Sequence, residues 1–374
     1  MYKLLAIFST VLIVTHSLPS YAQFDNSIVP DEVMLQTYHE IKTPHKYGLV
    51  LTPSDNNLAF DSPSVFKKGS KWYMIYIAYD GRGYETWIAQ SKDLLRWKTL
   101  GRVMSFTDSS LWDDNQRAGY AALEQYQWGG KYKLQRYQGK YWMSYLGGNT
   151  KGYEAGVLSI GMANTKKNPA TAHEWDRLPK PILTIHDQDR SWWDNVTLYK
   201  SQVIWDKAKT LGYPFVMYYN GKGPDTIRKA KQTERIGMAV SDDMIHWKRY
   251  GKDPVLDHQH GITGDAYIQK IGDLWVMFYF GAWWGPYKGA FNRFACSYDM
   301  VNWTDWKGEN LIEPSEPYDD QYAHKTSIVK HKGVVYHFYC ATNKFNQRGI
   351  AVATSKDIGE STTHFIAPPA TEKK

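Results

Sequence analysis

The chain alternates between short runs rich in apolar and aromatic residues and short polar turns, and this alternation recurs five times. The first repeat shows the pattern, with an apolar run at residues 64–66, an aromatic run at residues 71–76 and a third run at residues 85–89. Apolar and polar residues alternate within these runs, which indicates strands and not helices. The pattern therefore predicts five copies of one small β-sheet unit. Their aromatic runs begin near Lys71, Lys140, Phe215, Trp275 and Val335.

Three repeats close with the same polar turn, Ser-x-Asp-x-x-x-Trp, at residues 91–97, 241–247 and 297–303. A sheet of this size cannot bury both faces alone, whereas radial packing of five sheets buries them and leaves only short edges. We therefore predict an all-β fold, a five-bladed β-propeller, as a single domain over residues 23–374. An elongated solenoid is the alternative, although its units are normally shorter and more uniform. The blades are expected at roughly residues 55–100, 120–178, 190–250, 262–306 and 320–358.

The N-terminal stretch differs from the repeats. Lys3, the apolar residues 4–14 and a small-x-small site at residues 20–22 form the pattern of a signal peptide over residues 1–22. The apolar stretch is too short to span a bilayer comfortably. We therefore expect an exported protein, periplasmic or secreted, with no membrane partner. Residues 23–58 precede the first full repeat, and a strand there could close the ring against the last repeat.

The composition bears on partners more than on the fold. The net charge is +7 and the pI about 9.0, but Lys and Arg are scattered, so nucleic acid is not expected as a partner. An acidic or sulfated oligosaccharide or polysaccharide would fit this charge. Aromatic residues make up 15% of the chain, which suits a sugar-stacking surface as well as sheet cores. The two cysteines, Cys296 and Cys340, lie in different repeats and are expected to be buried free thiols. A monomer is expected.

Acidic residues stand near the start of the first strand in several repeats. Asp61, Asp194 and Asp265 hold this place in repeats one, three and four, and His324 holds it in repeat five. Repeat two has no acid at that offset, and Glu124 lies several residues upstream. Innermost strands begin near the axis of a propeller, so these side chains are expected to converge on one pocket. Because charge is costly there, three matched acids favour a functional role over the turn capping common for Asp.

A cluster of carboxyl groups beside tryptophans predicts glycoside hydrolysis. One carboxylate activates water, and a second, kept protonated by neighbouring charge, protonates the leaving oxygen. Aromatic side chains beside the acids offer a stacking surface to the apolar faces of sugars. The tryptophans expected to form that surface are Trp192, Trp193, Trp283 and Trp284.

The segment Phe60-Asp61-Ser62-Pro63-Ser64-Val65 resembles the first-blade signature of glycoside hydrolase family 43 and its relatives in families 32, 117 and 130. The five-repeat register over residues 55–358 is similar as well. The resemblance implies a five-bladed propeller that inverts the configuration of an exposed pentose or related sugar. It implies that Asp61 is the general base, that Asp194 tunes the pKa of the acid, and that Asp265 holds the position of the general acid.

One departure from that family concerns the general acid, which is normally Glu, whereas this sequence offers Asp265. Glu124 and Glu234 are therefore kept as alternatives for the acid. His324 matches a blade-five histidine that in many relatives helps to hold a central calcium ion or a water molecule, so it is a candidate for sugar binding or, through water, for a metal. No cofactor is required by the predicted reaction.

The leading prediction is an exported, exo-acting and inverting glycosidase that removes a terminal sugar from plant or algal polysaccharide fragments. The resemblance implies xylose or arabinose as the first choice. A related glycoside phosphorylase or anhydro-galactosidase is the enzymatic alternative. A carbohydrate-binding propeller without catalysis is the third reading, although such a protein tends to repeat its binding residues in every blade. Candidates for the cationic pocket that a phosphorylase would need are Arg117, Arg136, Arg228 and Arg235.

Overall fold

The computed structural model describes residues 27–224 and 233–367, so the expected signal peptide lies outside the described residues. The described part of the protein is mostly β, as predicted, and its helix is α1 (Asp31–Ile41), which the sequence pattern did not reveal. No helix formed by the described residues is long and apolar enough to cross a membrane.

The strands form five antiparallel units, called sheets below, each of which follows the sequence up and down; single parallel pairings between some of them join the strands into one hydrogen-bonded set of 12 and one of 8. The first sheet contains β2 (Ala59–Lys68), β3 (Lys71–Tyr79), β4 (Tyr84–Ser91) and β5 (Trp97–Met104). The second contains β6 (Gln116–Ala121), β7 (Tyr141–Gly148), β8 (Ser159–Thr165) and β9 (Asp176–Arg177). The third contains β10 (Thr197–Trp205), β11 (Phe215–Gly223), β12 (Thr233–Ser241) and β13 (Trp247–Tyr250). The fourth contains β14 (Ile262–Ile271), β15 (Leu274–Ala282), β16 (Ala290–Ser297) and β17 (Thr304–Asp305). The fifth contains β18 (Tyr322–His331), β19 (Val334–Thr342), β20 (Arg348–Thr354) and the N-terminal β1 (His45–Leu51).

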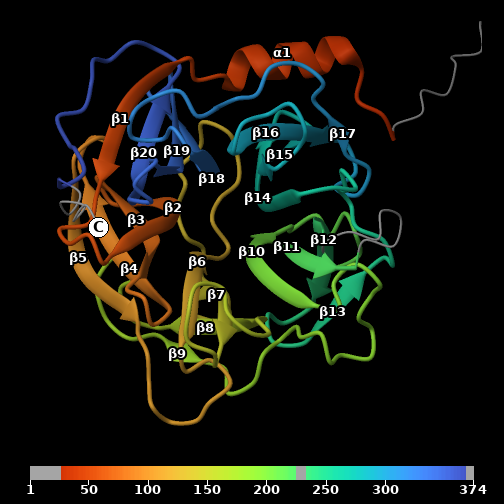
Figure 1. Cartoon of the computed structure of the whole chain (residues 1–374). Coiled ribbons are helices and arrows are strands. Elements are labelled where there is room, and N and C mark those ends of the chain that lie inside the picture. Colours follow the sequence, from red (N-terminus) through yellow and green to blue (C-terminus); the bar gives the residue numbers. More distant parts are fainter. Residues whose placement is uncertain (1–26, 225–232, 368–374) are drawn as a thin grey trace, which may run out of the picture.

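The five sheets lie around a common centre, with the first strand of each sheet innermost (Figure 1). Each inner strand contacts the inner strand of the next sheet, and β18 contacts β2. The strand considered within residues 23–58 is β1, which pairs antiparallel with β20. This pairing joins the N-terminal part of the described residues to the last sheet. Helix α1 packs its Met34 and Ile41 into the core that the fourth and fifth sheets share.

The repeated Ser-x-Asp-x-x-x-Trp motif forms a turn at the end of the third strand. In the first sheet, Ser91 Oγ accepts the backbone N–H groups of Asp93 and Leu94 at 3.1 and 2.9 Å, and the indole of Trp97 donates to the Leu94 carbonyl at 2.9 Å. Leu94 has a φ of 70°, in the left-handed region. The serine and aspartate bonds recur in the third and fourth sheets. The motif therefore shapes the fold and carries no chemistry.

The core lies between adjacent sheets. One cluster joins Val216 and Met238 of the third sheet to Met277 of the fourth, all of them buried. Cys296 belongs to the cluster that also holds α1, and Cys340 is buried beside the Phe60 carbonyl; both are free thiols, as predicted.

Candidate active site

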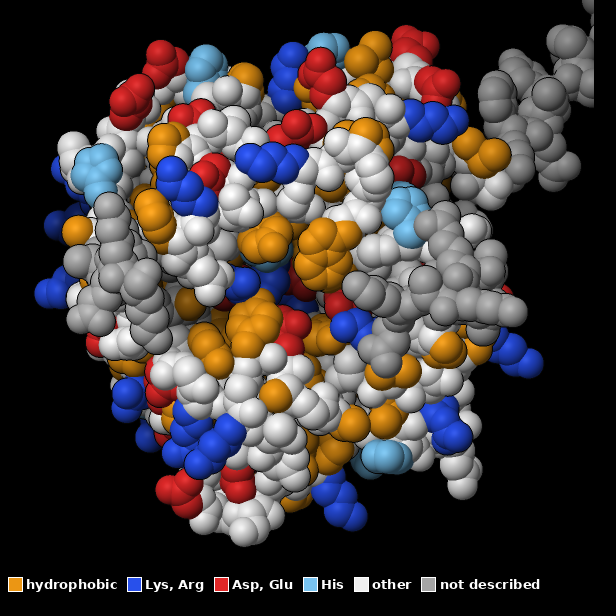
Figure 2. All heavy atoms as spheres, in the orientation of Figure 1, with side chains coloured by type: hydrophobic (Ala, Val, Ile, Leu, Met, Phe, Trp, Pro, Cys, Tyr) orange, Lys and Arg blue, Asp and Glu red, His pale blue; other side chains and the backbone are white. Residues whose placement is uncertain are grey.

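A pocket of ≈ 200 Å³ opens at the centre of one face, where the inner strands begin. Figure 2 shows the hollow, with acidic and basic side chains at its floor and hydrophobic side chains around it. Every sheet contributes to its lining from the inner strand. These residues are Asp61 on β2, Tyr120 on β6, Lys200 on β10, Asp265 on β14 and Lys325 on β18.

A bulge interrupts four inner strands, β2, β10, β14 and β18, near their starts, where side chains line this pocket. Ser62, Asp265 and Lys325 occupy equivalent positions in three of these bulges, with φ values of 46°, 58° and 62°. The left-handed region is uncommon for residues other than glycine, and such backbone strain concentrates at functional sites. Asp61 and His324 share the position just before the bulge, as the repeat register predicted, whereas Asp265 lies one residue further on.

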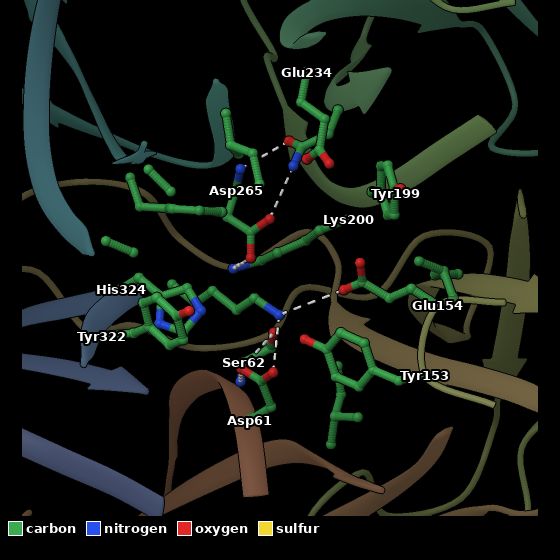
Figure 3. A pocket seen from close by; sticks show the side chains of 18 of the residues that line it. Asp61, Ser62, Tyr153, Glu154, Tyr199, Lys200, Glu234, Asp265, Tyr322 and His324 are labelled. Atoms are coloured by element: carbon green, nitrogen blue, oxygen red, sulfur yellow. Dashed lines mark hydrogen bonds and ion pairs between the residues drawn. The ribbon is translucent and has the colours of Figure 1, made fainter. Parts of the chain in front are cut away.

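Asp61, labelled in Figure 3, is held by two cations in the pocket. Its Oδ2 accepts hydrogen bonds from Lys325 Nζ at 2.8 Å and from Arg348 at 3.2 Å, and its Oδ1 accepts the backbone N–H of Ser62 at 2.7 Å. Burial opposes the charge of Asp61, but Lys325, Arg348 and His324 together hold the pKa of this carboxyl well below its usual range. Asp61 is therefore a permanent anion whose two oxygens are already engaged.

Glu234, near the start of β12, carries the carboxyl group best suited to giving up a proton. It is 5% exposed and forms an ion pair with Lys222 at 3.2 Å. Burial raises the pKa of Glu234 to about 7, and the charge of Glu154 adds to the effect, while Lys222 opposes it. A large fraction of Glu234 is therefore protonated at neutral pH.

Glu154 lies in the loop between β7 and β8, and its carboxyl group points into the same pocket (Figure 3). Its Oε1 accepts the Tyr84 hydroxyl at 3.2 Å and lies 3.9 Å from Lys325 Nζ. The neighbouring Tyr153 lines the pocket and accepts a hydrogen bond from Arg348 at 2.7 Å. Sequence reasoning missed Glu154, because a residue in a loop has no counterpart in the repeat register.

Asp265 is fixed by the side chain of Asn220, on β11. The Asp265 backbone N–H donates to Asn220 Oδ1 at 2.7 Å, and Asn220 Nδ2 donates to Asp265 Oδ1 at 2.9 Å. The remaining oxygen, Oδ2, lies 3.6 Å from Lys200 Nζ. Asp265 thus lines the pocket as predicted, with a lysine as its neighbour there.

Asp194 is not part of this pocket. It is fully buried, and it accepts hydrogen bonds from the Tyr219 hydroxyl at 2.8 Å and from Arg249 at 2.5 Å. It precedes β10 and does not occupy the bulge position of Asp265. Aspartates with a tyrosine and a basic partner recur in the second and fifth sheets. These units are Asp113–Tyr145–Arg177 and Asp319–Tyr339–Lys46. The placement of Asp194 beside the catalytic groups is therefore corrected, because this aspartate belongs to a repeated structural unit.

Glu124, the alternative acid, also lies outside the pocket lining. Its Oε2 accepts the Tyr267 hydroxyl at 3.0 Å, and burial raises its pKa well above the usual range. Its raised pKa therefore serves no chemistry in this pocket.

Of the four predicted tryptophans, Trp283 alone lines the pocket. Its side chain is 63% exposed, at the end of β15, so one face is open to a sugar. Trp192 is exposed but bonds Asp253. Trp193 is buried against Gly237, where an added Cβ would lie 2.2 Å from its ring. Trp284 is buried with its ring stacked on His258. The other three do not line this pocket, and a role for them in sugar stacking stays a prediction.

None of the described arginines suggested for a phosphate pocket lines this one, and Arg228 lies outside the described residues. Arg117 pairs with Asp113, Arg136 lies over the Tyr141 ring, and Arg235 pairs with Asp257. The cations in the pocket lining are Lys200, Lys325 and Arg348.

His324 lines the pocket, with Nδ1 3.3 Å from the carbonyl oxygen of Cys340. Burial and the charge of Lys325 lower the pKa of His324 to about 3, so it is neutral. Within residues 27–224 and 233–367 no group of three or more His, Cys, Asp or Glu side chains could hold a metal ion. The cations beside His324, Lys325 and Arg348, suit a calcium ion poorly.

Comparison with protein-family models and with curated proteins gave no match. Among solved structures, one described as a complex of BT0996 and RGII shares 54% sequence identity, with a TM-score of 0.89, over 91% of the present sequence and 99% of its own. A structure described as "Glycoside hydrolase" gives the same values. "Crystal structure of a thermostable family-43 glycoside hydrolase" is 15% identical, with a TM-score of 0.55, over 85% of the present sequence and 98% of its own, and shows a shared fold alone. The resemblance inferred from residues 60–65 is confirmed.

Proposed function

We propose that this protein, which belongs to the glycoside hydrolases, removes a terminal sugar in the central pocket, with Glu234 as general acid and Glu154 as its partner carboxylate. The observation that carries the proposal is the presence of both glutamates in one pocket, close enough for Glu154 to raise the pKa of Glu234. Glycoside hydrolysis needs one carboxyl group that is protonated and one that is not.

The division of roles follows from the contacts of each group. A general acid works best when its pKa lies near the working pH, and the raised pKa of Glu234, about 7, suits catalysis near neutral pH. The contacts of Glu154 with Tyr84 and Lys325 both use Oε1, so its carboxylate suits attack on the sugar or activation of water. Asp61 engages both oxygens with N–H donors. We therefore assign Asp61 to fixing Lys325 and Arg348 in place of the general-base role that the resemblance implied.

We also infer that the five sheets form a five-bladed β-propeller that β1 closes in the last blade. The contact of β18 with β2 and the pairing of β1 with β20 support this inference. A pocket at the axis, enclosed by all five inner strands, favours a terminal sugar over the middle of a long polysaccharide. Inversion of configuration remains a prediction from the resemblance to family 43.

The description of the 54% identical relative names RGII. We therefore propose an oligosaccharide of RGII type as the substrate class, and xylose or arabinose as first choices for the terminal sugar. The net charge of +7 would favour acidic sugars in the parts of the substrate that lie beyond the terminal sugar.

Digestion of an RGII oligosaccharide mixture tests this function. The wild-type protein should release one monosaccharide, and NMR of the fresh product should show its anomer. The double variant Glu154→Gln with Glu234→Gln should release none, whereas Glu124→Gln, a matched change of a buried carboxyl outside the pocket, should stay active. Release by the double variant, turnover that depends on added phosphate, or binding with no release by the wild type would each contradict the proposal.

Lys222→Met should move the alkaline limb of the pH profile of kcat/KM upward from about pH 7. Lys222 lowers the pKa of Glu234, so its removal raises that pKa and keeps the acid protonated to higher pH. Kinetics over a pH range of about 5–9 would measure the shift, with the exposed Lys248→Met as control. An unmoved limb, or one that moves downward, would remove Glu234 from the role of acid.

A further inference from the structure

Two buried polar atoms at the pocket floor have no hydrogen-bond partner among the described residues. They are Nζ of Lys200 and Oδ2 of Asp265, and the two residues are only 5% and 4% exposed. The two atoms lie 3.6 Å apart, which allows an ion pair but is too long for a hydrogen bond. Leaving a buried polar atom unpaired costs about 1–3 kcal/mol. The pair is therefore arranged for a third group.

The position of Asp265 is fixed by more than this lysine. Asn220 binds both its backbone N–H and its Oδ1, which directs Oδ2 toward Lys200 (Figure 3). The preceding Gly264 permits this close approach, since an added Cβ would lie 2.4 Å from Asn220 Nδ2. The left-handed φ of Asp265, 58°, belongs to the same arrangement. Two hydrogen bonds from one side chain together with a strained backbone hold Asp265 in one orientation, which is typical of groups that bind a ligand.

The chemistry of the pair selects its ligand. Lys200 offers a donor and Asp265 an acceptor, so the missing group must accept one hydrogen bond and donate another. A sugar hydroxyl does both. An ether oxygen cannot donate to Asp265, a deoxygenated carbon meets neither atom, and a carboxylate would face the like charge of Asp265.

We propose that Lys200 and Asp265 together hold one free hydroxyl group of the terminal sugar, which accepts from Lys200 Nζ and donates to Asp265 Oδ2. The proposal rests on the proposed function and deepens it. It makes this pair a specificity-determining site that rejects sugars deoxygenated or O-methylated at that position. It also gives Asp265 a binding role in place of the general-acid role expected from the sequence.

The test is a cycle between enzyme variants and substrate analogues. For the RGII oligosaccharide that the wild type cleaves, analogues lacking one hydroxyl of the terminal sugar are compared in turn. One analogue should lose at least about 10²-fold in kcat/KM with the wild type, because both buried atoms then stay unpaired. On the parent substrate, Lys200→Met and Asp265→Ala should each lower kcat/KM by a similar factor. On that one analogue, their kcat/KM should be little lower than that of the wild type. Lys248→Met, exposed on β13, should change none of these ratios.

The outcomes separate this inference from the function. If the variants lose the same factor on every analogue, no hydroxyl is held by the pair and the inference is wrong, although the enzyme remains a hydrolase. If the wild type cleaves nothing, the proposed hydrolase function is wrong. The same variants and analogues are then compared by calorimetry, with the Kd of each oligosaccharide as the measured quantity. If a single variant does not fold, Lys200→Met with Asp265→Asn removes both charges together and is compared instead.

Discussion

Glu234→Gln should lower kcat/KM on an oligosaccharide by about 10²–10⁴-fold, the usual contribution of a general acid. The substitution keeps the shape of the side chain and mimics its protonated form, so the fold should persist. Because the folded-state pKa of Glu234 is raised to about 7, the wild type loses stability as pH rises from the ordinary glutamate value toward 7. The variant lacks this group, so above pH 7 it should be the more stable of the two.

Substrates with different leaving groups distinguish the role of Glu234 from that of Glu154. An aryl glycoside with an acidic phenol departs without protonation, so Glu234→Gln should retain most of the wild-type rate on it. Glu154→Gln should lose activity on both substrates, since its role does not depend on the leaving group. Equal losses for Glu234→Gln on the aryl glycoside and the oligosaccharide would contradict the assignment. Glu124→Gln serves as the control on both substrates.

The repeat register predicted one part of the site well. Asp61 and His324 reach the pocket because both stand just before the bulge of an inner strand, where the backbone turns toward the axis. Asp265 reaches it from the next position, through the left-handed bulge residue itself. A one-residue shift of register changes which groups a side chain meets, and sequence spacing did not resolve it.

An alignment of the first strands alone did not reveal the pocket residues that come from the third strands of the sheets. In an antiparallel sheet of this kind, the third strand runs parallel to the first, so its start lies on the same face. Tyr84, Glu234, Ala290 and Arg348 each stand at or next to the start of a third strand, and all line the pocket. This signal was available in the sequence. Glu154 gave none, because it comes from a loop.

Asp194 and Trp193 show the opposite case, in which residue types that often carry chemistry are packed inside the fold. Trp193 fills a space that Gly221 and Gly237 leave open, and Asp194 bonds the tyrosine beside it. Sequence spacing placed both near the axis, but burial of an aspartate with a tyrosine and a cation is a repeated feature of these sheets. Three-dimensional contacts were needed to separate the two roles.

Arg249→Met should lower the free energy of unfolding by about 3–5 kcal/mol, because it leaves the fully buried carboxylate of Asp194 without its cation. Arg249 also binds Asp189 at 2.8 Å and the Thr184 carbonyl at 3.0 Å, so one substitution breaks a network that joins β13 to the segment before β10. The matched control is Arg96→Met, because the Arg96 side chain is exposed and its pair with the half-buried Asp93 should contribute only about 0.2–1 kcal/mol.

Urea unfolding of both variants measures this difference, and kinetics decide what it means for Asp194. If Asp194 acts only in the fold, folded Asp194→Asn protein should keep the pH profile of kcat/KM of the wild type while unfolding at lower urea. If Asp194 instead tunes the catalytic acid, its substitution should move the alkaline limb without a matching loss of stability. The contacts favour the first result. Both carboxylate oxygens of Asp194 accept hydrogen bonds, from Tyr219, Arg249 and the Ser191 N–H, and Asp194 does not line the pocket that holds Glu234.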